Sequence, residues 1–345
     1  MGYRVTIKPS GHQFENEAGE TLLESALRSG IAINYHCSSG SCGECHGRLI
    51  EGELAEAQFH DYRFSKQQLR DGSLLLCRNR AASDLVISAN EINDPASIPL
   101  QTIETKVYKI DHPNDEYLIL QLRTPRSRTL QFLAGQTVKL IIPELESYSI
   151  AVASCPCNGM ILQFHINLNH PHPFVQRLSE KEKDVGKIVV EGPFGEHILN
   201  VQYDLPIIFI AKDSEFGAIK SLIEQVINLE LPQPIRLFWI ASDDEHHYME
   251  NYCRSWCDQL DDYHFKGIKQ GDSEDIEGVL AQISDMLNVE KIDYSLSDIY
   301  IASPFSDLYR MQKWWQTHAD AQNIYLMTEN RNRYADKPKD GTVVT

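Results

Sequence analysis

The pattern of hydrophobic and polar positions changes twice along the chain. As far as about residue 90, short strand-like runs alternate with two segments whose apolar residues recur at helical spacing. The expected strands lie at residues 4–7, 13–16, 46–50 and 84–88, and the expected helices at 19–30 and 65–70. This mixture predicts a small β-grasp-like unit over residues 1–90.

Residues 91–100 are rich in Pro, Asn and Ser, which predicts a linker. From 101 to 200 the pattern is one of short alternating strands, with a single helix expected at 174–183. The expected strands lie at 105–110, 117–121, 137–142, 161–166 and 187–191. We therefore expect a small antiparallel β-barrel.

From residue 201 strands and helices alternate, which predicts a parallel sheet covered on both faces. Buried strands are expected at 206–211, 235–241 and 298–302, and helices at 217–228, 248–259, 276–287 and 308–318. Residues 328–345 read as a polar, loose tail. The predicted fold class is multidomain, α+β followed by α/β, with the α/β domain at 201–327.

Composition and charge restrict the function. A chain of 345 residues with 42% hydrophobic residues suits two or three packed domains. The formal net charge of −17 argues against a nucleic-acid partner, because phosphates would be repelled. No apolar run reaches the roughly 18 residues of a membrane span. The eight cysteines show no secreted disulfide pattern, so we expect a reducing, cytoplasmic location.

Four of the cysteines carry the strongest chemical signal. Cys37, Cys42 and Cys45 follow the spacing C-x4-C-x2-C, and Cys77 lies far downstream. This is the spacing of plant-type [2Fe–2S] ferredoxins, in which each iron takes two thiolates. Gly40 and Gly43 permit the tight turns that aim backbone N–H groups at sulfur. The four cysteines are the predicted metal ligands, and the chain is predicted to transfer electrons.

Two other interpretations of these cysteines remain open. Structural zinc usually takes its ligands as two close pairs, which this spacing does not resemble. Four unrelated thiols are the other alternative. The remaining cysteines form the pairs Cys155/Cys157 and Cys253/Cys257, for which we expect free buried thiols.

The order of domains resembles that of the ferredoxin–flavin reductases that serve oxygenases and the CDP-hexulose deoxygenation system. Three segments of the expected barrel look like the family's "GQ", "RxYS" and "GPFG" motifs: residues 132–137, 146–149 and 191–195. In that family NAD(P)H gives a hydride to FAD, and the flavin passes single electrons to the cluster. The resemblance implies that the barrel at 101–200 is of the flavin-binding type and that the α/β domain at 201–327 is of the nucleotide-binding kind. It also implies that Tyr148 lies against the isoalloxazine of FAD and that Ser149 hydrogen-bonds its reactive edge.

The sequence departs from the family at segments that contact nucleotides. Glu146 replaces the Arg of "RxYS", whose guanidinium would bind pyrophosphate. The "GxxS" segment aligns with His170-Pro-His172-Pro, where two prolines remove backbone donors. The glycine-rich turn of the α/β domain is replaced by residues 212–217, which include two acidic residues, and "CGPPxM" by residues 302–307.

These observations leave several functional hypotheses. In the leading one the chain is a one-electron carrier or partner subunit whose reductase-like half has lost NAD(P)H binding. FAD binding is left open in this hypothesis. The alternative is a working NAD(P)H-dependent FAD/[2Fe–2S] reductase component that supplies an oxygenase or a deoxysugar dehydrase, so enzyme activity is left undecided. Mixed FAD-only binding and a purely structural cluster are further options. The reductase hypothesis requires substitute cations, for which the candidates are Arg123, Arg126, Arg128, Arg177 and Lys212.

Overall fold

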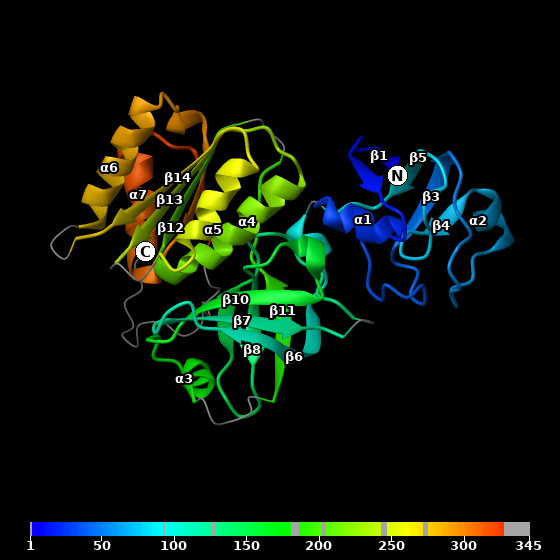
Figure 1. The fold of residues 1–345 in the computed structure, drawn as a ribbon, viewed down its shortest axis with the longest axis horizontal. Helices are drawn as coiled ribbons and strands as arrows, with labels where there is room; N and C mark the ends of the chain where they lie inside the picture. Colours follow the sequence, from blue (N-terminus) through cyan, green and yellow to red (C-terminus); the bar gives the residue numbers. More distant parts are fainter. Residues whose placement is uncertain are drawn as a thin grey trace, which may run out of the picture.

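The computed structural model describes residues 2–92, 94–125, 128–180, 186–201, 205–242, 247–271 and 275–327. Within these ranges the chain forms three sheets that follow one another in sequence (Figure 1). The predicted fold class is confirmed. The predicted polar tail lies outside the described residues. Among the helices that the structure describes, none has the length and apolarity needed to cross a bilayer.

The first sheet is mixed, with the strand order β2-β1-β5-β3-β4. Its strands are β1 (Tyr3–Lys8), β2 (Gln13–Asn16), β3 (His46–Glu51), β4 (Ser73–Leu75) and β5 (Leu85–Ala89), and its helices are α1 (Leu22–Arg28) and α2 (Lys66–Arg70). Helix α1 begins at a capping box in which Thr21 and Glu24 satisfy each other's backbone N–H groups. Sequence prediction found all of these elements except β4.

The second sheet is antiparallel throughout, with the order β10-β7-β6-β11-β8-β9. Its strands are β6 (Gln101–Asp111), β7 (Tyr117–Arg123), β8 (Thr137–Ile141), β9 (Tyr148–Ala151), β10 (Ile161–Asn167) and β11 (Lys187–Phe194). Two short 3₁₀ helices belong to this part of the chain, η1 (Pro95–Ser97) and η2 (Pro156–Asn158), together with helix α3 (Pro173–Ser179). The predicted barrel-type sheet is present, and β9 is the strand that prediction missed.

The third sheet is parallel, with the order β14-β13-β12-β15-β16. Its strands are β12 (Ile207–Lys212), β13 (Ile235–Ala241), β14 (Tyr263–Lys269), β15 (Asp298–Ala302) and β16 (Asn323–Leu326). The helices are α4 (Phe216–Asn228), α5 (Glu250–Ser255), α6 (Ile276–Val289) and α7 (Phe305–His318), with the 3₁₀ helices η3 (Asp213–Glu215), η4 (Trp256–Asp258) and η5 (Tyr294–Leu296).

Both faces of this parallel sheet are buried, as its nearly continuous apolar strands predict. On one face, Phe209 and Trp239 pack with residues of α4 and α5. On the other face, Ile210 and Ile240 pack with residues of α6 and α7. Since successive strand residues point to opposite faces, a single strand such as β12 supplies both cores.

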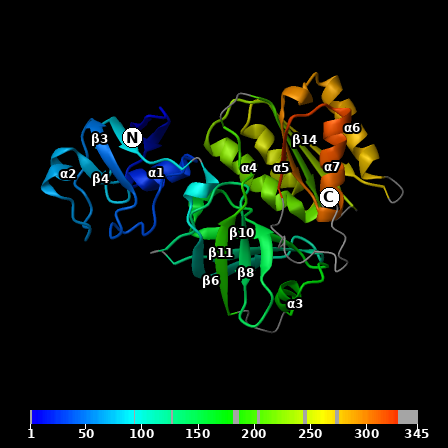
Figure 2. The ribbon, with the colours of Figure 1, turned by 180° about the vertical axis from the view of Figure 1, so that it is seen from behind.

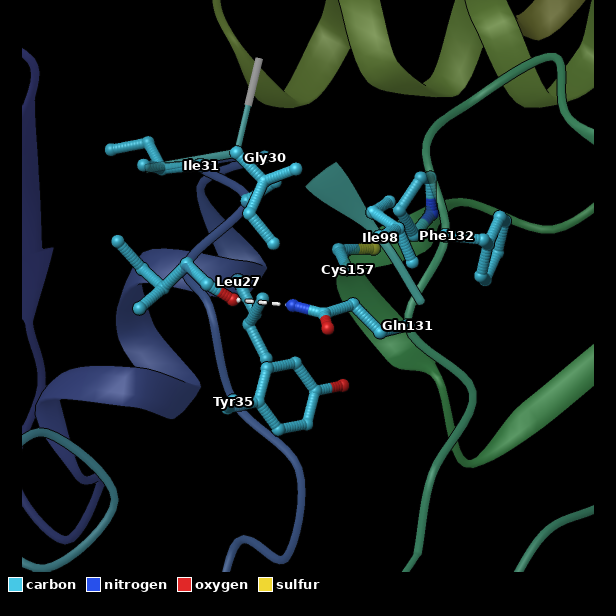
Figure 3. A pocket seen from close by; sticks show the side chains of 12 residues that line it. Leu27, Gly30, Ile31, Tyr35, Ile98, Gln131, Phe132 and Cys157 are labelled. Carbon is cyan, nitrogen blue, oxygen red and sulfur yellow. Dashed lines mark hydrogen bonds between the residues drawn. The ribbon is translucent and has the colours of Figure 1, made fainter. Parts of the chain in front are cut away.

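The first sheet lies at one end of the molecule, beside the barrel, while the α/β domain packs on the barrel itself (Figures 1 and 2). The junction between residues 1–90 and the rest is closely packed, and Figure 3 shows Gln131 reaching across it toward the backbone of the first domain. Among the hydrogen bonds that cross the junction are those from Gln131 Nε2 to Ile33 O at 3.0 Å, from Thr129 Oγ1 to Tyr35 Oη at 3.0 Å, and from Gln225 Nε2 to Gly30 O at 2.6 Å.

Candidate iron–sulfur and nucleotide sites

The structure brings the four predicted ligand cysteines together. Cys37, Cys42 and Cys45 lie on the loop between α1 and β3, and Cys77 follows β4. Antiparallel pairing of β3 with β4 carries Cys45 to Cys77, and their Sγ atoms lie 3.1 Å apart. Cys42 is partly exposed, whereas the other three cysteines are buried.

Cys37 receives a set of hydrogen bonds that favours its thiolate. The backbone N–H groups of Ser41 and Cys42 each lie 3.4 Å from Cys37 Sγ. Burial by itself would raise the pKa of Cys37, but hydrogen bonds from Ser41, Ser39 and the backbone outweigh it and lower the pKa to about 5. The loop is therefore built to hold a negatively charged sulfur, which is the form that binds iron.

The other three sulfurs interact within the same small volume. Burial raises the pKa of Cys42, whose Sγ accepts a hydrogen bond from Glu44 N–H at 3.4 Å. The hydrogen bond between Cys45 and Cys77 lowers the pKa of Cys45 and raises that of Cys77, as expected of two thiols that share a proton. The negative charge on Cys37 opposes ionisation of both Cys45 and Cys77, so the Cys37 sulfur lies near these two.

Glycine is required at two positions of the cysteine loop. Gly40 and Gly43 have φ angles of +76° and +85°. A Cβ at Gly43 would lie 2.2 Å from Tyr62 Cε2, and a Cβ at Gly40 would lie 2.5 Å from His60 Cβ. Both turns and the close approach of residues 60–62 therefore depend on the absence of a side chain.

The sulfurs are arranged as two pairs, Cys37 with Cys42 and Cys45 with Cys77. In the part of the chain that the structure describes, no three Cys, His, Asp or Glu side chains are grouped to hold a single metal ion. A two-iron cluster needs two thiolates on each iron, and two adjacent pairs with backbone N–H donors suit it.

A second candidate site lies between the barrel and the α/β domain. The cavity has a volume of about 450 Å³. Its walls are formed by Tyr148, Asn167 and His170 of the barrel, by Ser214 and Glu215 before α4, and by residues 303–306 and Leu308 at the start of α7. Segments that lie up to about 150 residues apart in the sequence thus meet here, and all of the departures from the family pattern except Glu146 contribute a wall residue.

Comparisons with known proteins agree with this architecture. Residues 5–82 match the family described as "2Fe-2S iron-sulfur cluster binding domain". The chain is 27% identical over 327 residues to the CDP-6-deoxy-L-threo-D-glycero-4-hexulose-3-dehydrase reductase of Yersinia pseudotuberculosis, covering 94% of this chain and 98% of that protein. It is 24% identical over 310 residues to the reductase component of propane 2-monooxygenase from Gordonia, covering 88% and 89% of the two chains.

The chain is a ferredoxin domain fused to a reductase-like module. Its fold is shared by the Amycolatopsis cytochrome P450 reductase GcoB, with a TM-score of 0.57 at 16% identity over 94% of this chain and 98% of that one. The ferredoxin reductase in carbazole 1,9a-dioxygenase gives a TM-score of 0.56 at 21% identity, with the same coverage of each chain. Electron transfer is thus the general activity to which the fused ferredoxin and reductase-like domains point.

The predicted FAD residues occupy neighbouring positions on β9. The Tyr148 side chain is 5% exposed and stacks on Phe174 at 5.5 Å between ring centroids. The rings of His170 and His172 lie 5.6 and 5.0 Å from it. Ser149 points to the other face of the strand and does not line the cavity. Neighbouring side chains therefore surround the Tyr148 ring.

The turn after β12 is acidic and has its own hydrogen bonds. Asp213 is 9% exposed, and its carboxylate accepts hydrogen bonds from the N–H and Oγ of Ser242 at 2.9 and 2.7 Å. Lys212 is ion-paired with Asp307 at 2.6 Å, with side-chain exposures of 11% and 16%. The cation of this turn is thus held by a carboxylate of the reductase-like module itself.

The other proposed substitute cations are dispersed. Arg123 stacks over the ring of Tyr108 at 4.0 Å, and Arg128 is exposed. Arg177 lies 3.9 Å from Glu180, and Arg126 falls outside the described residues.

Sequence analysis missed Asn167 of the cavity, which lies at the end of β10. An isolated Asn gives no sequence signal, because Asn is common in loops and only the folded chain brings it to the cavity. Ser303, which follows β15, belongs to the segment 302–307 that the sequence singled out. It is 4% exposed, and no hydrogen-bond partner for its Oγ is found in the described part of the chain.

Proposed function

We propose that this chain is a one-electron carrier or electron-transfer subunit in which the ferredoxin domain is active and the reductase-like module has lost NAD(P)H binding. The observation that carries the proposal is a contrast between the two sites. The cysteine loop has backbone N–H donors at two of its sulfurs and glycines at its two tight turns. The cavity between the barrel and the α/β domain is instead lined by the acidic Glu215, and the turn beside it holds Asp213 and the ion-paired Lys212.

We assign Cys37 and Cys42 to one iron and Cys45 and Cys77 to the other. When bound, a [2Fe–2S] cluster accepts and releases a single electron. The N–H groups of Ser41, Cys42 and Glu44 would stabilise the negative charge on the first pair of sulfurs. Burial of Cys45 and Cys77 keeps water from the second pair.

The loss of nucleotide binding follows from charge and packing. Asp213 and Glu215 place carboxylates where dinucleotide phosphates would approach α4, and Lys212 is neutralised by Asp307. Losing the charged hydrogen bonds of one Arg, here replaced by Glu146, costs about 1.5–3 kcal/mol. The Tyr148 ring has little free surface for a flavin. Helices α3 and α7, which flank the cavity, also lie on the side of the molecule away from the ferredoxin domain (Figures 1 and 2).

The second candidate is an NAD(P)H-dependent FAD/[2Fe–2S] reductase component. The near-complete coverage of the dehydrase reductase favours it, as does a cavity of about 450 Å³ at the expected place. Under either hypothesis the partner is a redox protein, and the names of the relatives suggest an oxygenase or a dehydrase.

We further propose the domain limits 1–90, 91–100, 101–200 and 201–327. Strands β1–β5 end at Ala89, β6–β11 run from Gln101 to Phe194, and β12–β16 run from Ile207 to Leu326. Each sheet therefore falls within one proposed range.

An anaerobic absorbance titration tests the proposal. The purified protein is reconstituted with iron and sulfide and incubated with FAD, bound flavin is quantified after desalting, and NADH, NADPH and finally dithionite are added in turn. We expect about two irons per chain, little flavin, and bleaching of the cluster by dithionite alone. Rapid bleaching of the cluster by either pyridine nucleotide would refute the carrier proposal and establish the reductase. Failure to retain iron would refute both.

A further inference from the structure

Two thiols outside the predicted cluster lie where the ferredoxin domain, the barrel and α4 meet. Cys155 caps η2, and its Sγ accepts a hydrogen bond from Cys157 N–H at 3.1 Å. Helix η2 packs against both α1 and α4. Cys157 is also part of the domain junction shown in Figure 3. The pair therefore lies where the ferredoxin domain and the reductase-like module are in contact.

One side-chain amide contacts both sulfurs. Asn228 Nδ2 lies 2.8 Å from Cys155 Sγ and 3.5 Å from Cys157 Sγ. A shared donor keeps the two sulfurs close together, and it stabilises a thiolate more than a thiol because hydrogen bonds to ionised acceptors are stronger.

The two thiols differ in access and in acidity. Cys155 is 7% exposed, whereas Cys157 is half-buried. Both line a cavity of about 410 Å³ that also contains Ser154 and Lys220, so a small solute can approach Cys157. The hydrogen bond from Cys155 lowers the pKa of Cys157, while burial and the neighbouring Cys157 raise the pKa of Cys155. An accessible, acidic thiol beside a resolving cysteine is the usual arrangement of a redox-sensing pair.

We propose that Cys155 and Cys157 are a peroxide-responsive thiol pair that forms a reversible disulfide. The Cys157 thiolate attacks one oxygen of hydrogen peroxide, the O–O bond breaks, and the departing hydroxide takes a proton to become water. Cys157 is then a sulfenic acid. Cys155 displaces its hydroxyl group, forming the S–S bond and a second water. Two thiols are oxidised by two electrons and one peroxide is reduced to two waters.

Disulfide formation would change the contacts at the domain junction. The Cys155 thiol donates to Gln225 Oε1 at 3.9 Å, and the amide of Gln225 holds Gly30 O of the ferredoxin domain. Oxidation removes this S–H donor. It also draws Cys157 of η2 toward the N-cap residue Cys155, and η2 packs against α1. The thiol pair thus links oxidant exposure to the contact that holds the ferredoxin domain.

Mass spectrometry of one tryptic peptide tests the proposal without interference from the cluster cysteines. Cleavage after Lys139 and Arg177 releases residues 140–177, in which Cys155 and Cys157 are the only cysteines. The reconstituted full chain is treated with about equimolar hydrogen peroxide, alkylated and digested. We expect the peptide to lose two hydrogens and both alkylation sites, and dithiothreitol to restore them.

Cys257 is the internal control, because it is exposed and its neighbour Cys253 is fully buried. We expect Cys157 to react about tenfold faster than Cys257, because the Asn228 amide lies 3.5 Å from the Cys157 sulfur and hydrogen bonds to a thiolate are stronger than those to a thiol. In Cys155→Ser a dimedone-reactive sulfenic acid should persist at Cys157. In Cys157→Ser, Cys155 should not react.

Two substitutions of the shared donor test the geometry. Asn228→Asp keeps the shape of the side chain but replaces a donor with a charge, and Asn228→Ala removes the donor. Each should slow disulfide formation about tenfold. Asn288→Ala, on the exposed surface of α6, should leave the rate unchanged. Full alkylation of both cysteines after peroxide, or equal rates at Cys157 and Cys257, would overturn the proposal.

Discussion

The hydrogen bond from Gln131 to the ferredoxin domain should stabilise that domain against unfolding. Gln131 is 8% exposed and donates from Nε2 to Ile33 O at 3.0 Å. The substitution Gln131→Leu keeps nearly the same volume but removes this donor. The carbonyl of Ile33 is then buried without a partner.

The expected cost can be worked from this contact. An unsatisfied buried acceptor costs about 1–3 kcal/mol. With a denaturant slope of about 2 kcal/mol per molar urea, a loss of about 2 kcal/mol lowers the urea midpoint of the ferredoxin domain by about 1 M. Tyr35→Phe should cost less, about 1 kcal/mol, because it leaves only the hydroxyl of Thr129 without its acceptor.

The two halves of the molecule can be followed separately. All four tryptophans, Trp239, Trp256, Trp314 and Trp315, lie in the α/β domain, whereas the visible spectrum of a cluster reports on residues 1–90. Urea titrations are run anaerobically with matched incubation times. In Gln131→Leu the visible transition should shift to lower urea while the fluorescence transition stays nearly in place.

The control is Gln176→Leu, which makes the same chemical change on the exposed surface of α3. It should move neither transition. If Gln131→Leu also left the visible midpoint unchanged, the ferredoxin domain would not be stabilised by this contact, and the reasoning from the buried carbonyl would be wrong.

Three further predictions concern the loop, the acid stability and the cluster. Gly43→Ala should greatly lower the bound iron measured per chain, because its Cβ would lie 2.2 Å from the Tyr62 ring at a φ of +85°; unchanged iron would show that the loop relaxes. Partial burial raises the pKa of Glu290, but hydrogen bonds from His264 and Arg236 outweigh it and lower the pKa. The resulting stability is present above the unfolded value near 4.5 and is lost as the pH falls through the folded value. Glu290→Gln should therefore flatten the acid-side decline of the unfolding free energy, and a decline as steep as in the parent would contradict this. Redox potentiometry should give a cluster potential of about −400 mV, and a value above zero would contradict the plant-type assignment.

The strands that sequence analysis missed have a common position. β4, β9, β14 and β16 all lie at the edges of their sheets. An edge strand is covered less completely, so it needs neither a long apolar run nor strict alternation. β9 and β16 have four residues each, and β14 mixes exposed His and Lys with buried Tyr and Ile. The central strands of the parallel sheet, β12, β13 and β15, are in contrast strongly apolar and were predicted within a few residues.

The two sites differ in how far the sequence could predict them. The cysteine loop is local: three of the four cysteines, the glycines and the backbone donors lie within nine residues, so spacing alone indicates the chemistry. The nucleotide cavity is assembled from distant segments by the packing of two domains. Motif comparison identified several of its walls, but it could not find Asn167 or the packing around Tyr148.

The ion pair between Lys212 and Asp307 shows why this difference matters for function. In sequence, Lys212 is a candidate to replace a lost phosphate contact, because it follows the first strand of the α/β domain. In the structure it is 2.6 Å from a carboxylate 95 residues away, at the start of α7. To bind a phosphate it would have to break a largely buried pair and leave Asp307 uncompensated, at a cost of about 3–5 kcal/mol if the pair were fully buried. A single phosphate contact recovers only about 1.5–3 kcal/mol. The Lys212 cation, which would favour the reductase hypothesis, therefore forms an ion pair that joins β12 to α7.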